Sequence, residues 1–175
     1  SEVYLEAECK DGEKIYRADA PFDEALKALR AKGVEYPVSI EELSRRRMEF
    51  PKEHSLNDNG SYTCEGFLYV KEAQPLLVRI SPLVEDIELT RQAVIANSAG
   101  RYFTTQNKEL YDKYLSIAEE DKDKSPIERR VLIPPSRAQF AISPEENPEF
   151  FEGLFGHDGK EYLKFIKRDK IQVYP

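Results

Sequence analysis

Residues 3–18 read Val-Tyr-Leu-Glu-Ala-Glu-Cys-Lys-Asp-Gly-Glu-Lys-Ile-Tyr-Arg-Ala, and this stretch decides the class of fold that we expect. Apolar and polar residues alternate from Val3 to Cys9, which is the period of a strand with one buried face. Asp11-Gly12 follows as a tight-turn signal, and a second strand is expected over residues 14–18. The stretch therefore predicts an antiparallel β-hairpin.

Helical spacing of apolar residues predicts three longer helices, near residues 21–32, 83–96 and 105–119. Ser39 and Glu42 match a capping box, which predicts a further short helix that stops before Pro51. Residues 51–61 are turn formers almost throughout, so we expect a long exposed loop there.

Further strands are expected where aromatic and branched residues cluster. Residues 62–71 and 76–80 predict an antiparallel pair, and residues 131–133 and 137–143 favour two more strands. A helix is expected between Asn147 and Gly156. The basic and aromatic residues of 160–174 alternate in a way that favours the edge element of a sheet, although such a strip could also stack on single-stranded nucleic acid.

Together these elements predict an α+β fold: a single domain over residues 1–175, with a mainly antiparallel sheet of five to seven strands and helices packed on one face. The helix expected over 105–119 runs into an acidic stretch. Acidic residues at a helix C-terminus oppose the macrodipole, so residues 119–126 are expected to fray and to form a possible flexible segment.

Composition restricts the class of protein. The chain has 175 residues, of which 33 are acidic and 26 basic, for a net charge of −7. Such a chain repels nucleic acid and anionic membranes at long range, so a nucleic-acid partner is disfavoured. The longest stretch without a charge spans nine residues, 92–100, too few to cross a membrane. The scarcity of Trp, Met and Cys beside abundant Lys and Glu is typical of heat-adapted proteins.

The cysteines and the N-terminus bear on location. Cys9 and Cys64 lie too far apart in sequence for a disulfide framework, which leaves one bridge possible and favours a reducing compartment. The N-terminus has neither the basic start nor the apolar segment of a signal peptide. We therefore expect a cytoplasmic protein.

Catalytic and cofactor motifs are sparse. The eight glycines are scattered singly, so the sequence contains no P-loop and no dinucleotide-binding fingerprint. Cys9, Cys64, His54 and His157 have the composition of a zinc site but not its paired spacing, and we expect no metal and no cofactor. A small hydrolase that uses His157 or a pair of carboxylates, with or without a divalent cation, is the enzyme alternative.

Two groups of arginines are the most interpretable feature. Arginine presents a planar fork that suits phosphate or carboxylate, and two such groups that met in space would form a cationic patch on an acidic molecule. The competing interpretation is that each arginine pairs with a nearby acid on the surface. The leading hypothesis is a non-enzymatic binding or regulatory module that engages a protein partner or a small anionic ligand. Its candidate site residues are Arg45, Arg46, Arg47, Arg129, Arg130 and Arg137.

Overall fold

The computed structural model describes residues 2–99 and 106–174, and the chain divides into two compact units. Unit 1 comprises Ser1–Cys64 and Pro82–Phe103, and unit 2 comprises Glu65–Ser81 and Thr104–Pro175. The chain therefore passes between the units three times, and none of these passages falls within residues 119–126. The expectation of a single domain stays a prediction.

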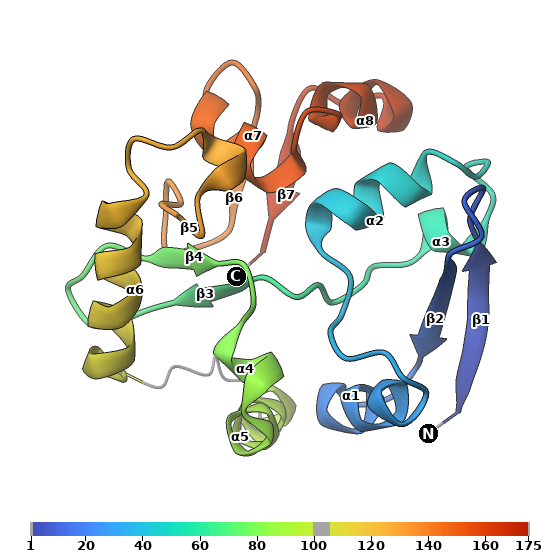
Figure 1. Ribbon diagram of the computed structural model, residues 1–175, viewed down its shortest axis with the longest axis horizontal. Helices are drawn as coiled ribbons and strands as arrows, with labels where there is room; N and C mark the ends of the chain where they lie inside the picture. The colour runs from blue at the N-terminus through green and yellow to red at the C-terminus, as the bar shows by residue number, and fades with distance from the viewer. Residues whose placement is uncertain (1, 100–105, 175) are drawn as a thin grey trace. The chain divides into compact units, whose positions relative to one another are not determined.

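Unit 1 is built from a hairpin and helices (Figure 1). Its elements are β1 (Val3–Glu8), β2 (Lys14–Ala18), α1 (Phe22–Ala31), α2 (Ile40–Arg47), α3 (Ser55–Asp58), α4 (Pro82–Glu85) and α5 (Ile87–Ser98).

The hairpin predicted from residues 3–18 is confirmed. β1 and β2 pair antiparallel, and the register shifts between Leu5 and Ala7, which marks a bulge on β1. Gly12 turns the chain at a φ of +88°, and its N–H donates to the Cys9 carbonyl at 2.9 Å. Only glycine adopts that φ without strain, so the Asp-Gly signal located the turn correctly.

The helices α2 and α3 pack on this hairpin. Ala7, Leu43 and Leu56 form a buried cluster, one from each of β1, α2 and α3. The predicted capping box is confirmed in part, because the Glu42 N–H donates to Ser39 Oγ at 3.1 Å. The prediction that residues 51–61 are a long exposed loop is wrong at α3. There the apolar side chain of Leu56 is buried in the core, and the backbone around it forms the helical turn α3.

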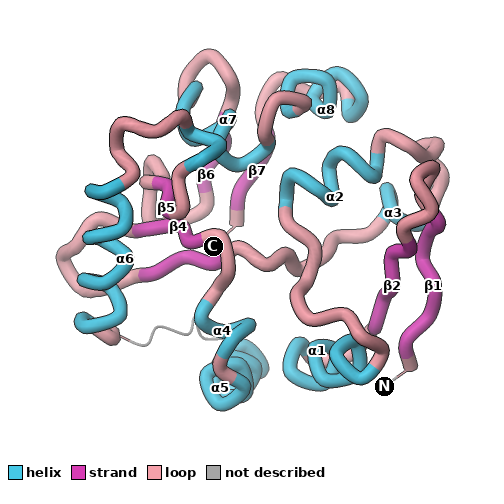
Figure 2. Tube along the Cα trace, viewed as in Figure 1, coloured by secondary structure: helices cyan, strands magenta, loops and turns pink. Residues whose placement is uncertain are grey.

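Unit 2 combines short strands with helices and long loops (Figure 2). Its elements are β3 (Gly66–Leu68), β4 (Leu76–Val78), α6 (Lys108–Glu120), a 3₁₀ turn (Pro126–Glu128), β5 (Val131–Leu132), β6 (Phe140–Ile142), α7 (Pro148–Phe155), α8 (Gly159–Ile166) and β7 (Ile171–Val173).

Helix α6 covers one face of the sheet β3-β4-β5. Leu68, Leu76, Val78 and Val131 of the strands share a buried cluster with Tyr111 of α6. The Tyr111 hydroxyl donates to the Gln74 carbonyl at 2.5 Å, which ties the helix to the β3–β4 connection.

The α+β class and the antiparallel pairing are confirmed, but the strands do not form one sheet. The seven strands of the described residues lie in three separate sheets, ordered β1-β2, β3-β4-β5 and β6-β7. The five strands of unit 2 are only two or three residues long, and such short strands offer few ladder positions for building one larger sheet. The edge element expected at 160–174 is wrong over α8, where Gly159, Tyr162 and Leu163 are buried at helical spacing, whereas its last part does contain a strand, β7.

No helix in the described ranges, 2–99 and 106–174, has the length and the apolar character needed to cross a membrane.

Candidate functional site

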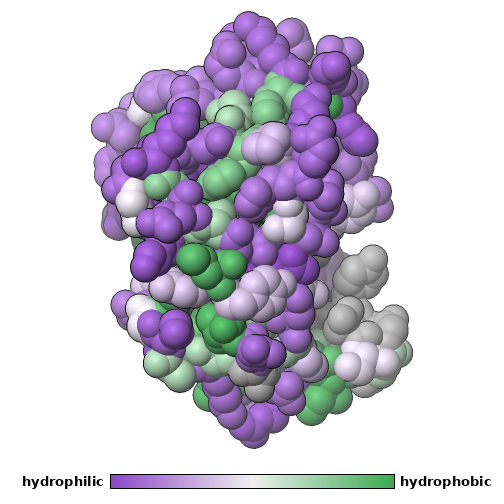
Figure 3. Space-filling model, turned by 90° about the vertical axis from the view of Figure 1, so that its right-hand side faces the viewer, coloured by the Kyte–Doolittle hydropathy of each residue, from purple (hydrophilic) through white to green (hydrophobic). Residues whose placement is uncertain are grey.

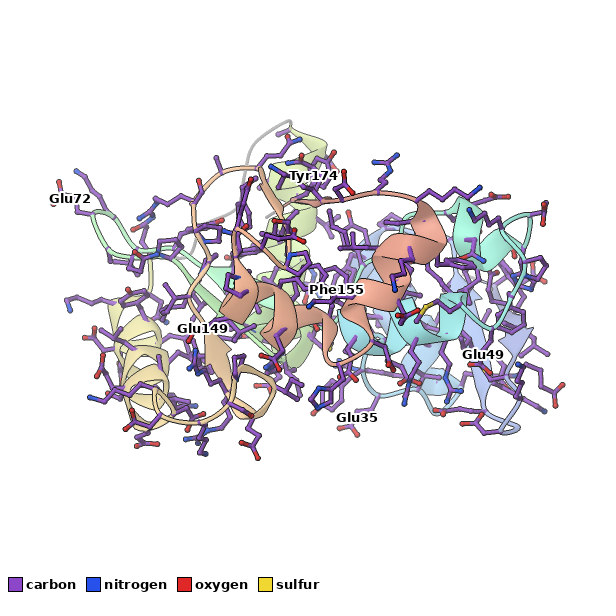
Figure 4. All side chains as sticks on the ribbon, turned by 90° about the horizontal axis from the view of Figure 1, so that it is seen from above. Glu35, Glu49, Glu72, Glu149, Phe155 and Tyr174 are labelled. Carbon is purple, nitrogen blue, oxygen red and sulfur yellow. The ribbon has the colours of Figure 1, made fainter. Side chains whose placement is uncertain are left out.

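Arg46 lies at the junction of α2 with the hairpin turn. Its side chain is 8% exposed, and its guanidinium donates to four carboxylates. Two come from the turn, Asp11 at 2.8 Å and Glu13 at 2.6 Å. The other two are Glu42 on α2 at 2.7 Å and Glu49 just after it at 3.0 Å. Figure 4 labels Glu49. Arg46 thus fastens the hairpin to α2.

The charges around Arg46 do not cancel. Arg45 also pairs with Glu42, so four carboxylates face two guanidinium groups and leave a net charge of −2. The bond from Arg46 holds the pKa of Asp11 below its usual range. The Lys10 N–H and then Arg46 do the same for the pKa of Glu49. These carboxylates therefore stay ionised at neutral pH, and the cluster is acidic in sum.

Arg47 serves the local backbone. Its guanidinium donates to the Leu56 carbonyl at 2.9 Å and to the Asn59 carbonyl at 2.7 Å. The three consecutive arginines of α2 therefore have different surroundings. Arg45 is on the surface, Arg46 is buried among carboxylates, and Arg47 holds the α3 region.

In unit 2, Arg129 and Arg130 also have separate partners. Arg129 donates to the carbonyls of Lys122 and Lys124 and pairs with Glu149 at 3.2 Å. Arg130 makes a two-pronged pair with Asp121, with both N···O distances at 2.9 Å.

Asp121 is the buried residue of the acidic stretch that follows α6. Its side chain is 1% exposed, and the bond from the Arg130 side chain, followed by that from its backbone N–H, holds the pKa of Asp121 well below its usual range. Residues 119–126 were expected to fray because their charges oppose the helix dipole. That expectation stays a prediction; the structure places Asp121 at the helix cap and offsets its charge with Arg130 and Lys124.

Arg137 differs from the other members of its group. It donates to the carbonyls of Val70 and Ala73 and stacks over the Tyr69 ring, 5.2 Å from the centroid. No carboxylate pairs with it in residues 2–99 and 106–174, so its positive charge is uncompensated.

The two arginine groups belong to different units, Arg45 to Arg47 to unit 1 and the others to unit 2. Within each unit the arginines have separate partners, apart from Glu42, which pairs with both Arg45 and Arg46.

The histidines and cysteines do not assemble a catalytic or metal centre. His54 caps α3, accepting from the Leu56 N–H at 3.0 Å, and lies against Phe50. His157 is exposed, and Cys9 and Cys64 are both buried. Burial raises the pKa of the Cys9 thiol, which disfavours the nucleophilic thiolate. Across the described part of the chain, no three metal-binding side chains come together.

A groove of about 640 Å³ lies within unit 1, and the sequence did not reveal it. It is lined by β2, by one face of α1, by residues 34–38, by α2 and by residues 55–62. Its apolar lining residues include Leu26, Leu29, Val38, Leu43 and Leu56. This volume is in the range of sites that take up small molecules or short peptide segments.

The rim of the groove combines tyrosines with charges that are already paired. Tyr36 and Tyr62 are exposed, and the Tyr62 ring meets Phe22 edge-on at 5.1 Å. Arg17 pairs with Glu6 at 3.5 Å and with Asp19 at 2.7 Å. Two tyrosines near turn-forming residues, Tyr36 before Pro37 and Tyr62 two residues after Gly60, are the sequence signal that could have indicated this site.

Two other surface features are weaker candidates. A hollow of about 470 Å³ is lined by Arg30, Gly33, Glu35, Tyr36 and Glu85, and it offers little apolar surface. On the side of the molecule where β1 lies, hydrophobic side chains reach the surface among hydrophilic ones (Figure 3).

No protein-family model, curated protein or solved structure matches this chain.

Proposed function

We propose that this chain is a non-enzymatic binding module, and that it holds a segment of a protein partner in the groove of unit 1. The observation that carries the proposal is an open groove of about 640 Å³ with apolar walls, formed by elements of a single unit.

The chemistry of the lining favours binding over catalysis. Neither histidine nor cysteine lines the groove, and its arginines, Arg17 and Arg46, are bonded to carboxylates. A general acid or base needs a group that is free to exchange a proton with a substrate. Apolar walls with aromatic rims, by contrast, are what protein and peptide ligands use.

Titration with Nile red, a neutral dye that fluoresces in apolar surroundings, tests the groove. Leu29 lies on α1 and lines it, whereas Leu115 lies on α6 in unit 2, is 36% exposed and does not. We expect Leu29→Gln to weaken dye binding at least threefold and Leu115→Gln to leave it unchanged, with the far-ultraviolet circular dichroism of both variants preserved. Equal dye binding by all three proteins would refute the groove as the binding site.

A second proposal is that the protein binds a small anionic ligand at Arg137, one of the arginines singled out in the sequence. Its uncompensated charge is the observation that favours it. Inorganic phosphate should raise the melting temperature of the protein, and Arg137→Gln should remove that effect. Arg91, an exposed arginine paired with Glu88, offers the control Arg91→Gln. An unchanged phosphate effect in Arg137→Gln would eliminate this second proposal.

For its location we propose the cytoplasm, since Cys9 is a free and buried thiol, which a reducing compartment keeps reduced. The hydrolase and the nucleic-acid alternatives stay predictions without a supporting site.

A further inference from the structure

We infer that the partner segment binds as an extended strand along the open edge of β2, with apolar side chains in the groove and a basic residue beside the Arg46 carboxylates. The inference rests on the proposed function and adds the backbone conformation and the chemistry of the partner.

The lining of the groove points to the strand edge. All five residues of β2, from Lys14 to Ala18, line it. Side chains of a strand alternate between its two faces, so a groove on one face would meet every second residue. Five consecutive lining residues therefore favour a groove that runs along the backbone of β2 over one that meets a single row of side chains.

That edge is open for pairing. β2 pairs with β1 on one side and with no other strand of the described residues. Alternate residues of an antiparallel edge strand direct their N–H and C=O groups outward, where an extended peptide can bond to them. The bulge lies on β1 rather than on β2, and bulges disfavour edge pairing. The regular edge is therefore the one beside the groove.

The excess of carboxylates at the turn end of β2 favours a basic residue in the partner. At the turn end of β2, the carboxylates of Asp11, Glu13, Glu42 and Glu49 exceed the positive charge of Arg45 and Arg46. Glu13 is the most exposed of the four, at 65%. A lysine or arginine of the partner placed there would offset one of the two excess negative charges, and the partner's alternate apolar residues would contact the groove walls.

A six-residue peptide that reads Lys-Val-Ser-Val-Ser-Val, labelled with fluorescein at its C-terminal end, is the probe. Its binding is followed by fluorescence anisotropy. Two further peptides carry N-methyl groups, one on the valines and one on the serines, which removes the N–H groups of one edge or of the other. Strand addition predicts that one of these two peptides loses binding by more than tenfold, and that the other binds like the parent.

The charge is tested on both partners. We expect Glu13→Gln to weaken binding of the lysine peptide roughly two- to fivefold, the range of an exposed ion pair. Binding of a peptide with norleucine in place of lysine should be unchanged. Glu120 is the matched control, since it is also 65% exposed and bonded to an arginine but lies in unit 2. Glu120→Gln should change neither affinity.

The results of these binding experiments distinguish a failure of strand addition from a failure of the proposed binding groove. Equal binding of both N-methylated peptides, with loss in Leu29→Gln, overturns strand addition and keeps the groove. Dye binding that depends on Leu29 with no binding of any peptide overturns the peptide partner in favour of a small apolar molecule. Equal effects of Glu13→Gln on the lysine and norleucine peptides overturn the basic residue. Dye and peptide binding that are both insensitive to Leu29→Gln overturn the proposed function itself.

Discussion

Replacing Arg46 by methionine should destabilise the protein strongly, and by an amount that depends on pH. Methionine retains much of the apolar stem and removes the guanidinium. Four carboxylates then face one another without the cation that bonds to all of them. Because the Arg46 side chain is only 8% exposed, water cannot enter freely to take over its bonds.

The magnitude follows from which partners are buried. Glu42 and Glu49 are 29% and 18% exposed, and removing the cation of a largely buried pair costs about 3–5 kcal/mol. Asp11 and Glu13 are mostly exposed and contribute little. We therefore expect a loss of about 3 kcal/mol in the free energy of unfolding at pH 7, the lower end of that range.

The sign of the pH dependence separates this explanation from a packing defect. In the parent protein the pKa values of Asp11 and Glu49 are lowered, so their stabilisation is present above their unfolded pKa, about 4, and is lost as pH falls through the folded pKa. In Arg46→Met the crowded carboxylates lose their cation and bind protons more readily on folding. The variant therefore gains stability relative to the parent as pH falls, and the difference should shrink to about 1 kcal/mol near pH 3.

Urea denaturation followed by circular dichroism at pH 7 and pH 3 measures both values. Arg45→Met is the matched control: this neighbour is exposed, pairs with one carboxylate and should cost less than about 0.5 kcal/mol. Adding Glu49→Gln to Arg46→Met should restore part of the loss, because it removes one unpaired charge. A loss below 1 kcal/mol at pH 7, or a loss that does not change with pH, would refute the reasoning.

Three further predictions concern unit 2. Arg79 donates to four backbone carbonyls, and a lysine cannot reach them all. Arg79→Lys should therefore lower the free energy of unfolding by about 2–3 kcal/mol in urea denaturation. A loss under about 0.5 kcal/mol would contradict this. A Cβ on Gly153 would lie 2.6 Å from Leu132 Cδ2, so Gly153→Ala should lower stability by about 1–3 kcal/mol; an unchanged melting temperature would show that the site can relax. The Tyr69 hydroxyl is buried, has no hydrogen-bond partner in the described residues, and burial raises the pKa of Tyr69 to about 12. Tyr69→Phe should therefore be neutral or slightly stabilising, whereas Tyr111→Phe, which loses a 2.5 Å bond, should cost about 1 kcal/mol; the opposite order of the two melting temperatures would contradict this.

Local signals predicted local structure well. The Asp-Gly turn, the cap at Ser39 and the helix between Asn147 and Gly156 all depend on neighbours within a few residues, and all are present. The helix expected from residue 105 begins at Lys108 in α6, and residue 105 itself lies outside the described residues. Strands were located but not grouped, because pairing partners are chosen by contacts between distant segments.

The candidate site was harder to predict. A run of three arginines shows that cations are present, and it does not show what each one faces. Arg46 is buried among carboxylates that include two from a turn more than thirty residues earlier, so its role could not be read from its own neighbourhood. The groove has no motif at all, because segments far apart in the sequence form its walls.

The amino-acid sequence alone determined that the chain is α+β, that its first strands form a hairpin at Gly12, and that it carries a net charge of −7. Periodicity, turn chemistry and composition are properties of neighbouring residues, and the sequence displays them directly. Only the tertiary structure decided that the strands divide into three sheets, that Arg46 links the hairpin turn to α2 and that β2 borders an apolar groove. Those outcomes depend on which distant side chains exclude water together, and that is settled when the chain packs.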